Sequence, residues 1–171
     1  MKQNLLIVGA GIYGLIAKDI AVDMACFDKI GFIDDNAKTA MDGSAVLGTV
    51  ADMNTLAQQY DAVAVAIGNP EVRLRILAYV AANTSYKTVS LIAPQAFVSP
   101  AASVAPGCIV EPMAVIHARS VLETGAVVSA GAVVNHGGHL LPGAHADCNA
   151  TVAGFATVEA NTKVKSNTYF E

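Results

Sequence analysis

Hydrophobic positions recur every six residues along the second half of the chain. Residues 92–169 divide into thirteen consecutive hexads without a change of register. The first position of each hexad is a branched aliphatic residue, except in the hexad that begins at Ala146, and the fifth position is always small. Neither the helical period of 3.6 nor the strand period of 2 produces a strict repeat of six, so the pattern predicts a parallel β-helix.

The hexad has a simple physical interpretation. Each one forms a short strand and a corner, with the branched residue pointing into a narrow prism and the small residue where the corner tightens. Three hexads make one coil, so residues eighteen apart stack at the strand spacing of about 4.8 Å, and each coil buries its neighbour's face. We therefore expect a β-helix over residues 91–171, and its handedness does not follow from the spacing. The alternative is an all-β domain whose periodicity is accidental.

Shorter apolar runs in residues 1–90 alternate with helical patterns. The runs predict buried strands at residues 4–8, 29–33, 62–67 and 87–91, and helices at residues 15–24, 52–59 and 71–82. This order is typical of a small, Rossmann-like α/β domain, βαβαβαβ, with a parallel doubly wound sheet. Because the sheet is too short for a full dinucleotide-binding fold, we expect a ligand the size of a mononucleotide.

A glycine motif, GAGIYG, directly follows the first predicted strand. In this motif Gly9 allows a tight turn, Gly11 lets a ligand approach the backbone, and Gly14 lets the next helix pack closely. The N-terminus of that helix suits a phosphate group. The other interpretation is a turn that closes a βα unit without any nucleotide.

Polar residues also follow the second and third predicted strands. Asp34 and Asp35 lie where an acidic residue often accepts a ribose hydroxyl, although adjacent carboxylates are also typical of a solvated turn. Gly68 and Asn69 follow the third strand. Because ligands of open α/β sheets bind beyond the carboxyl ends of the strands, we expect Gly9, Asp34 and Gly68 to face one pocket.

Composition excludes several classes of function. A net charge of −4 gives no basic surface for nucleic acid. The longest strongly apolar stretch near the start, residues 5–10, is far shorter than the roughly 20 residues that span a bilayer. No secretory signal is recognisable, so we expect a soluble, cytoplasmic protein without a membrane partner. Three cysteines that lie far apart argue against a disulfide scaffold.

Four histidines interrupt the hexads: His117, His136, His139 and His145. The last three lie within ten residues, with Cys148 nearby, and this clustering would suit a metal site. However, residues nine apart are half a coil apart, so His136 and His145 should point from opposite sides of one prism, and we expect no metal. Three prisms around a three-fold axis would instead bring the two imidazoles together from neighbouring subunits. Gly154, eighteen residues after His136, should stack on it with its N–H available to a ligand.

These features together resemble the bacterial nucleotide-sugar N-acetyltransferases of the bacillosamine and perosamine type, and the sialic acid O-acetyltransferases. The resemblance covers nearly the whole chain and implies a left-handed β-helix, a homotrimer and acetyl-CoA bound between neighbouring helices. It implies that His136 is the general base and that His145 and Gly154 bind acetyl-CoA. Gly11, Asp34, Asp35 and Asn69 match positions around the family's nucleotide-sugar. We expect Gly9, Ile12, Tyr13 and Gly68 to line the same site.

The chain departs from the family pattern in three places. Gly137 stands where the family usually has Glu or Asp, which orients the catalytic imidazole. Ile12 and Tyr13 replace a Gly-His pair, which should reshape the sugar end of the pocket. The repeats end at Glu171, about two coils earlier than is usual in the family.

The favoured function is acetyl-CoA-dependent transfer of an acetyl group to an amino group of a nucleotide-activated 4-amino sugar. Sugar O-acetylation is a close alternative. Gly137 and the early end of the repeats also suit a weakly active or inactive homologue that only binds a nucleotide-sugar. A nicotinamide-dependent enzyme is disfavoured, since the sheet is incomplete and no second catalytic domain is present.

Overall fold

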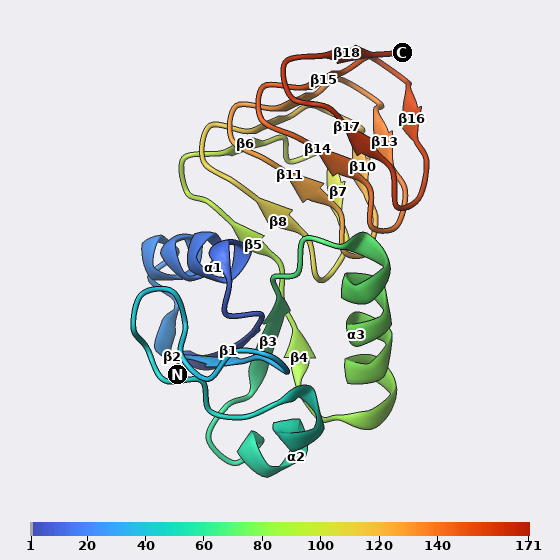
Figure 1. Ribbon diagram of the computed structural model, residues 1–171. Helices are drawn as coiled ribbons and strands as arrows, with labels where there is room; N and C mark the ends of the chain where they lie inside the picture. The colour runs from blue at the N-terminus through green and yellow to red at the C-terminus, as the bar shows by residue number, and fades with distance from the viewer. Residues whose placement is uncertain (1) are drawn as a thin grey trace. The chain divides into compact units, whose positions relative to one another are not determined.

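The computed structural model describes residues 2–171. They form two compact units, one up to Val89 and the other Ser90–Glu171 (Figure 1). The elements of the first unit are, in chain order, β1 (Gln3–Val8), α1 (Ile12–Asp23), β2 (Phe27–Ile33), η1 (Val50–Asp52), α2 (Met53–Leu56), β3 (Ala62–Val65), α3 (Pro70–Asn83) and β4 (Lys87–Thr88). This order confirms the predicted βαβαβαβ domain.

The first sheet is parallel, with strand order β2-β1-β3-β4. One face packs against α2 and α3 through a core that includes Leu6, Met53 and Leu77. From β1 the chain crosses to β2 on one side, and from β3 it crosses to β4 on the other side. The carboxyl ends of β1 and β3 are therefore a topological switch point, where open α/β sheets bind ligands.

Several predicted boundaries in this unit differ from the observed ones by two or three residues. The first helix begins at Ile12 rather than at residue 15, because the chain turns into the helix directly after Gly11. The fourth strand ends at Thr88 rather than at residue 91, because Leu91 pairs with Ile109 in the second unit instead.

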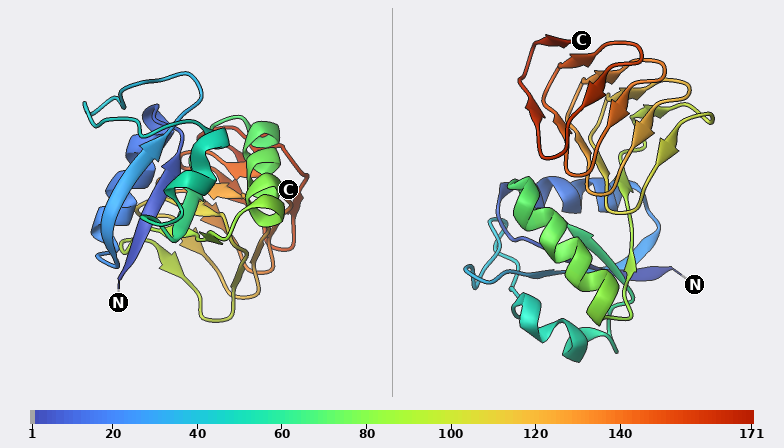
Figure 2. Two further views of the ribbon diagram at one scale, coloured as in Figure 1. Left: turned by 90° about the horizontal axis from the view of Figure 1, so that it is seen from below. Right: turned by 90° about the vertical axis from the view of Figure 1, so that its right-hand side faces the viewer.

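The second unit is a parallel β-helix of two-residue strands, which lie on three faces (Figure 2). Face 1 contains β5 (Leu91–Ile92), β8 (Ile109–Val110), β11 (Val127–Val128), β14 (His145–Ala146) and β17 (Lys163–Val164). Face 2 contains β6 (Phe97–Val98), β9 (Val115–Ile116), β12 (Val133–Val134), β15 (Thr151–Val152) and β18 (Tyr169–Phe170). Face 3 contains β7 (Ser103–Val104), β10 (Val121–Leu122), β13 (His139–Leu140) and β16 (Thr157–Val158).

The predicted register of the β-helix is confirmed. Paired strands join residues eighteen apart, as Val127 pairs with His145 and Val133 with Thr151. The first and fifth hexad positions fill the prism, so that residues such as Leu122, Ala126 and Leu140 are fully buried. Burying each branched side chain contributes about 1.5–3 kcal/mol relative to exposing it, which explains why the repeat tolerates no change of register.

The corners of the β-helix share a backbone feature that the hexad analysis missed. From Gly107 to Asn167, the fourth position of every hexad has a positive φ between 56° and 82°. Most of these residues are glycine or asparagine, which adopt the left-handed conformation most readily. The three exceptions are Met113, Arg119 and Phe155.

No helix within residues 2–171 combines the length and the apolar character that a membrane crossing would need.

Candidate functional site

The glycine turn after β1 has the predicted geometry. Gly9 has a φ of 109°, and a Cβ atom there would lie 2.6 Å from the carbonyl oxygen of Ala66. A Cβ on Gly14 would collide with the carbonyl oxygen of Gly9, so this glycine lets α1 pack against the turn. By contrast, a Cβ on Gly11 would meet nothing within 4 Å. The backbone at Gly11 is therefore open to a ligand.

Asp34 holds the glycine turn to the loop after β2. Its Oδ2 accepts a hydrogen bond from the Ala10 N–H at 2.9 Å, and its Oδ1 accepts from the N–H groups of Asn36 and Ala37 at 2.8 and 2.9 Å. Burial opposes ionisation of this carboxyl, but the three N–H donors outweigh it and hold the pKa of Asp34 below its ordinary value. Asp34 is thus a structural anion that shapes the turn.

Two cavities adjoin this loop within the first unit. The larger, of about 340 Å³, is lined by Asp34, Asp35, Asn36, Ala37, Lys38, Val46, Gly48 and Thr49. The smaller, of about 90 Å³, is lined by Val8, Gly9, Asp34, Asp35, Asn36, Val50, Ile67, Val72 and Ile76. The structure therefore brings Gly9, Asp34 and Asp35 together. Asp35 also accepts a hydrogen bond from the Val50 N–H at 2.8 Å, which fixes one of its oxygens.

The turn after β3 contains the remaining predicted polar residues. Tyr13 packs over Gly68, since a Cβ atom on Gly68 would lie 3.1 Å from the Tyr13 ring. Asn69 caps α3 by accepting a hydrogen bond from the Val72 N–H at 3.1 Å. Arg73, which sequence analysis missed, donates to the carbonyl oxygens of Ile67 and Gly68 at 2.6 and 3.2 Å. Gly68 and Asn69 do not line the two cavities described above.

His136 lies at the corner between face 2 and face 3, and its side chain is exposed. Its Nδ1 is 2.8 Å from Oδ1 of Asn135, and the same oxygen accepts a hydrogen bond from the His136 backbone N–H at 2.8 Å. The ring meets Phe155 edge-on, with centroids 5.2 Å apart and an interplanar angle of 85°. Within residues 2–171, Nε2 has no hydrogen-bond partner.

Gly154 provides the space for this imidazole. A Cβ on Gly154 would lie 2.9 Å from both Nε2 and Cε1 of His136, as the eighteen-residue stacking predicts. The Gly154 N–H has no acceptor in the described part of the chain. A free N–H donor therefore lies close to an open imidazole nitrogen.

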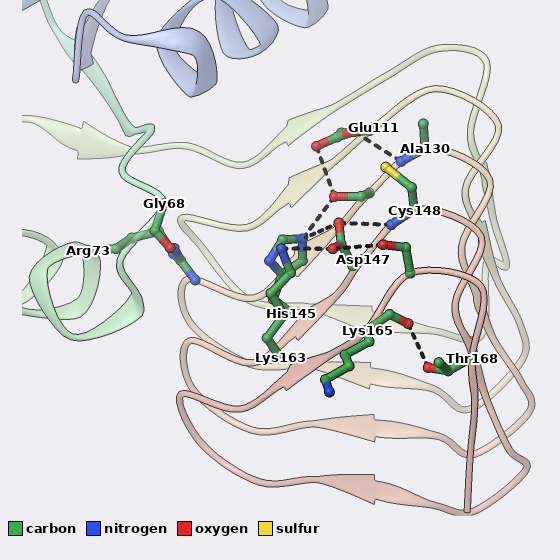
Figure 3. Close-up of polar contacts among 12 residues, drawn as sticks. Gly68, Arg73, Glu111, Ala130, His145, Asp147, Cys148, Lys163, Lys165 and Thr168 are labelled. Atoms are coloured by element: carbon green, nitrogen blue, oxygen red, sulfur yellow. Dashed lines mark hydrogen bonds and ion pairs between the residues drawn. The ribbon is translucent and has the colours of Figure 1, made fainter.

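His145 belongs to a polar network on face 1 (Figure 3). Oγ of Ser129 lies 3.1 Å from Oε1 of Glu111 and 2.8 Å from Nε2 of His145. Because a carboxylate only accepts hydrogen bonds, the Ser129 hydroxyl donates to Glu111 and accepts from His145 Nε2–H. A ligand that uses this nitrogen must replace Ser129 as its partner.

Asp147 continues the network beyond His145. Its Oδ1 lies 3.9 Å from His145 Nε2, and its Oδ2 pairs with Lys163 Nζ at 2.8 Å. Burial opposes ionisation of Asp147, but its bonds to Lys163 and the Cys148 N–H, with the charges of Lys163 and His145, lower its pKa. Face 1 therefore presents alternating acidic and basic groups around an imidazole.

The structure does not bring the four histidines together. His136 is at a corner, whereas His145 is on face 1, which lies opposite that corner in a three-sided coil. His139 pairs with Glu123 on face 3 at 2.6 Å, and His117 is exposed directly after β9. Among residues 2–171, no group of three His, Cys, Asp or Glu side chains could hold a metal ion.

Comparison with known proteins agrees with this two-unit arrangement. Residues 4–80 match the family model of the PglD N-terminal domain. No match was found among curated proteins. The acetyltransferase domain of PglB from Neisseria gonorrhoeae FA1090, solved in complex with acetyl coenzyme A, is 28% identical, with a TM-score of 0.70 over 99% of this chain and 88% of that chain. The first unit is therefore similar to the PglD N-terminal domain, and the second unit is a β-helix of hexapeptide repeats.

Two more distant structures share the fold. A variant of perosamine N-acetyltransferase from Caulobacter crescentus, solved with CoA and GDP-perosamine, is 21% identical, with a TM-score of 0.62 over 98% of this chain and 91% of that chain. WeeI from Acinetobacter baumannii AYE is 15% identical, with a TM-score of 0.69 over 97% of this chain and 87% of that chain. The β-helix that follows the first unit along the chain is accordingly the left-handed form that the sequence resemblance implied.

Sequence analysis missed two residues that contact His136. Asn135 holds Nδ1, and Phe155 lies against the ring. A signal for Phe155 was present, because it occupies a fourth hexad position where glycine and asparagine predominate. Asn135 had no comparable signal, since its importance depends on the direction of its side chain.

Proposed function

We propose that this protein is an acetyl-CoA-dependent N-acetyltransferase that acts on the amino group of a nucleotide-activated 4-amino sugar. The observation that carries the proposal is the exposed His136 imidazole, whose Nε2 is open above the side-chain-free Gly154. The similarity to an acetyltransferase domain solved with acetyl coenzyme A supports the cofactor assignment. The GDP-perosamine complex of a structural neighbour supports the acceptor class.

The geometry suits a direct transfer. The acceptor amine attacks the thioester carbonyl of acetyl-CoA, so that a C–N bond forms and the C–S bond breaks. Nε2 of His136 takes the proton from the nitrogen as general base and passes it to the departing CoA thiolate. The Gly154 N–H is placed to stabilise the oxyanion that develops on the carbonyl oxygen, and His145 contacts the thioester end of acetyl-CoA from a neighbouring subunit.

The PglD-type domain is the proposed site of the nucleotide-sugar. The larger cavity, of about 340 Å³, has the size of a small-molecule site. Asp35 offers a carboxylate oxygen to a ribose hydroxyl, and Lys38 offers a cation to a phosphate. Asp34 contributes indirectly, because both of its oxygens already hold backbone N–H groups. The open backbone of Gly11 is suited to close approach by the ligand.

The active assembly is proposed to be a homotrimer, because His136 and His145 lie on opposite sides of one coil. A neighbouring copy is needed to place a His145 opposite each His136. Face 2 supports this contact, since Phe97 and Tyr169 leave 58% and 64% of their surfaces exposed, with Val115 and Val133 between them. Cyclic three-fold symmetry would repeat the same cleft three times.

The test is acetyl transfer from acetyl-CoA to a panel of nucleotide 4-amino sugars that includes GDP-perosamine, with free CoA thiol measured by a colorimetric reagent. His136→Ala is expected to lower kcat by on the order of 10²- to 10⁴-fold, as loss of a general base does. His139→Ala is the matched control, because it removes a partly exposed imidazole from the same coil and should leave kcat within twofold.

Three results would contradict the proposal. One is the absence of turnover with every amino sugar, although the nucleotide-sugars bind; this would favour a binding protein. A second is equal activity of His136→Ala and wild type. Faster turnover of matched sugars that carry a hydroxyl in place of the amine would assign O-acetylation instead.

A further inference from the structure

His136 lacks the acidic residue that the sequence resemblance leads one to expect, because Gly137 occupies that position. The structure shows a physical reason for the glycine. Gly137 has a φ of 67°, and a Cβ there would lie 2.6 Å from Cδ1 of Phe155. The Phe155 ring thus fills the space into which a side chain at position 137 would project.

Asn135 contacts Nδ1 of the imidazole. One side-chain atom of Asn135 lies 2.8 Å from the backbone nitrogen of His136. Because a backbone N–H can only donate a hydrogen bond, this atom is the amide oxygen. The same oxygen is 2.8 Å from Nδ1. An oxygen acceptor requires a proton on Nδ1, and the neutral imidazole then has its lone pair on Nε2, the nitrogen next to Gly154. Asn135 therefore selects the tautomer that a general base needs.

Phe155 limits rotation of the same ring. It is 67% exposed and adopts a positive φ of 63°, a left-handed conformation that is unfavourable for a residue other than glycine. Its N–H donates to the His136 carbonyl oxygen at 3.1 Å, which ties the two corners together. A strained, exposed aromatic residue edge-on to an imidazole points to a role at the site rather than in the core.

We propose that Asn135 and Phe155 are positioning residues that replace the missing carboxylate: the amide fixes the tautomer of His136, and the ring fixes its orientation. The effect on kcat rests on the proposed function, whereas the tautomer of His136 does not. The charged and titratable groups that stack near the imidazole are His117 and Arg119, one coil before Asn135 and Gly137. The next coil contributes only Ala153, Gly154 and Phe155 at this corner.

The tautomer can be tested on the protein alone. Correlation spectra of ¹⁵N-labelled protein, with the imidazole signals assigned through His136→Ala, should show a protonated Nδ1 and an unprotonated Nε2 in the neutral form. Asn135→Ala should populate the other tautomer, and Asn135→Asp should restore the first. A neutral wild-type ring protonated mainly at Nε2 would overturn the inference, whether or not the protein transfers acetyl groups.

Kinetics test the consequence for catalysis. With acetyl-CoA and the amino-sugar panel, Asn135→Ala should lower kcat about 10- to 100-fold, as loss of ring placement does, and leave KM for acetyl-CoA within threefold. Asn135→Asp should recover most of kcat, with the acid limb of the pH–rate profile moved to higher pH, because a carboxylate stabilises the imidazolium more than an amide does. Phe155→Ala should lower kcat without moving that limb.

A matched control and a clear contrary outcome complete the design. Glu159 follows a strand of face 3 and occupies the same hexad position that Asn135 occupies after a strand of face 2. Glu159→Ala should therefore leave both kcat and the pH profile unchanged. If wild type is active and Asn135→Ala retains full kcat with an unchanged pH profile, Asn135 does not position His136. If wild type itself has no transferase activity, the proposed function fails, while the spectra still decide the tautomer.

Discussion

At the scale of single residues, the pairing of His136 with Gly154 follows from the coil. Other hexads have alanine at the third position, as at Ala118 and Ala130, so the backbone at this position accepts a Cβ. Only at Gly154 would the Cβ meet an imidazole of the preceding coil, 2.9 Å from its Nε2. The glycine is therefore required by its neighbour and not by its own conformation.

Gly154→Ala should consequently displace His136 with little effect on the fold. We expect kcat to fall about 10- to 100-fold, because small misplacements of a catalytic group have large effects, with the melting temperature lowered by a few degrees at most. In a His136→Ala background the same substitution should leave the melting temperature unchanged, because the clash is absent. Melting temperatures of wild type, the two single variants and the double variant measure the effect of Gly154→Ala in both backgrounds. A Gly154→Ala enzyme with wild-type kcat would contradict the steric argument.

At the scale of elements, the loop after β2 and the turn after β1 depend on one carboxylate. Asp34→Asn should destabilise the first unit by about 1–3 kcal/mol, because an amide cannot accept all three N–H bonds as strongly. The free energy of unfolding in urea measures this difference. Asp28→Asn, on an exposed part of β2, is the control and should stay within about 0.5 kcal/mol of wild type.

The same change has a predictable pH dependence. The pKa of Asp34 is lower in the folded state than in the unfolded state, where it is about 3.9. Its contribution is therefore fully present above about pH 4 and is lost as pH falls through the folded-state pKa. The stability difference between wild type and Asp34→Asn should shrink below pH 4. A difference that stays constant down to pH 2 would show that Asp34 acts without its charge.

In the β-helix, burial of apolar side chains opposes the backbone strain at the corners. Burial of the first and fifth hexad positions stabilises every coil, while the fourth position requires a left-handed backbone. Glycine and asparagine meet this requirement at most corners. Where they do not, at Met113, Arg119 and Phe155, the backbone is strained. The strained residue Phe155 contacts His136, which is consistent with a functional role for that corner.

At the scale of the whole molecule, the proposed site needs more than one chain. Val133→Glu on face 2 should weaken the proposed trimer, because a carboxylate would be placed in an apolar contact. Val121→Glu is the matched control, since it alters the same hexad position on face 3. Sedimentation velocity should show smaller particles for the first variant only, with loss of transferase activity. Dissociation by Val121→Glu and not by Val133→Glu would assign the contact to face 3.

The sequence by itself determined the fold class, the glycine turn and the register of the β-helix. These follow from local rules: branched residues at each sixth position have one way to be buried together, and glycine has few competitors where a turn needs positive φ. The strand register therefore agreed with the hexads from Leu91 onward.

Only the tertiary structure decided how the chemical groups are used. Asp34 was expected to meet a ribose, and the structure adds that its oxygens accept hydrogen bonds from three backbone N–H groups. Asn69 was expected near the ligand, and the structure adds that its side-chain oxygen caps α3. Asn135 and Phe155 gained importance because the coil brings their side chains against His136. The direction of a side chain and the groups that fill the neighbouring coil depend on contacts between distant residues, and no local pattern in the sequence contains them.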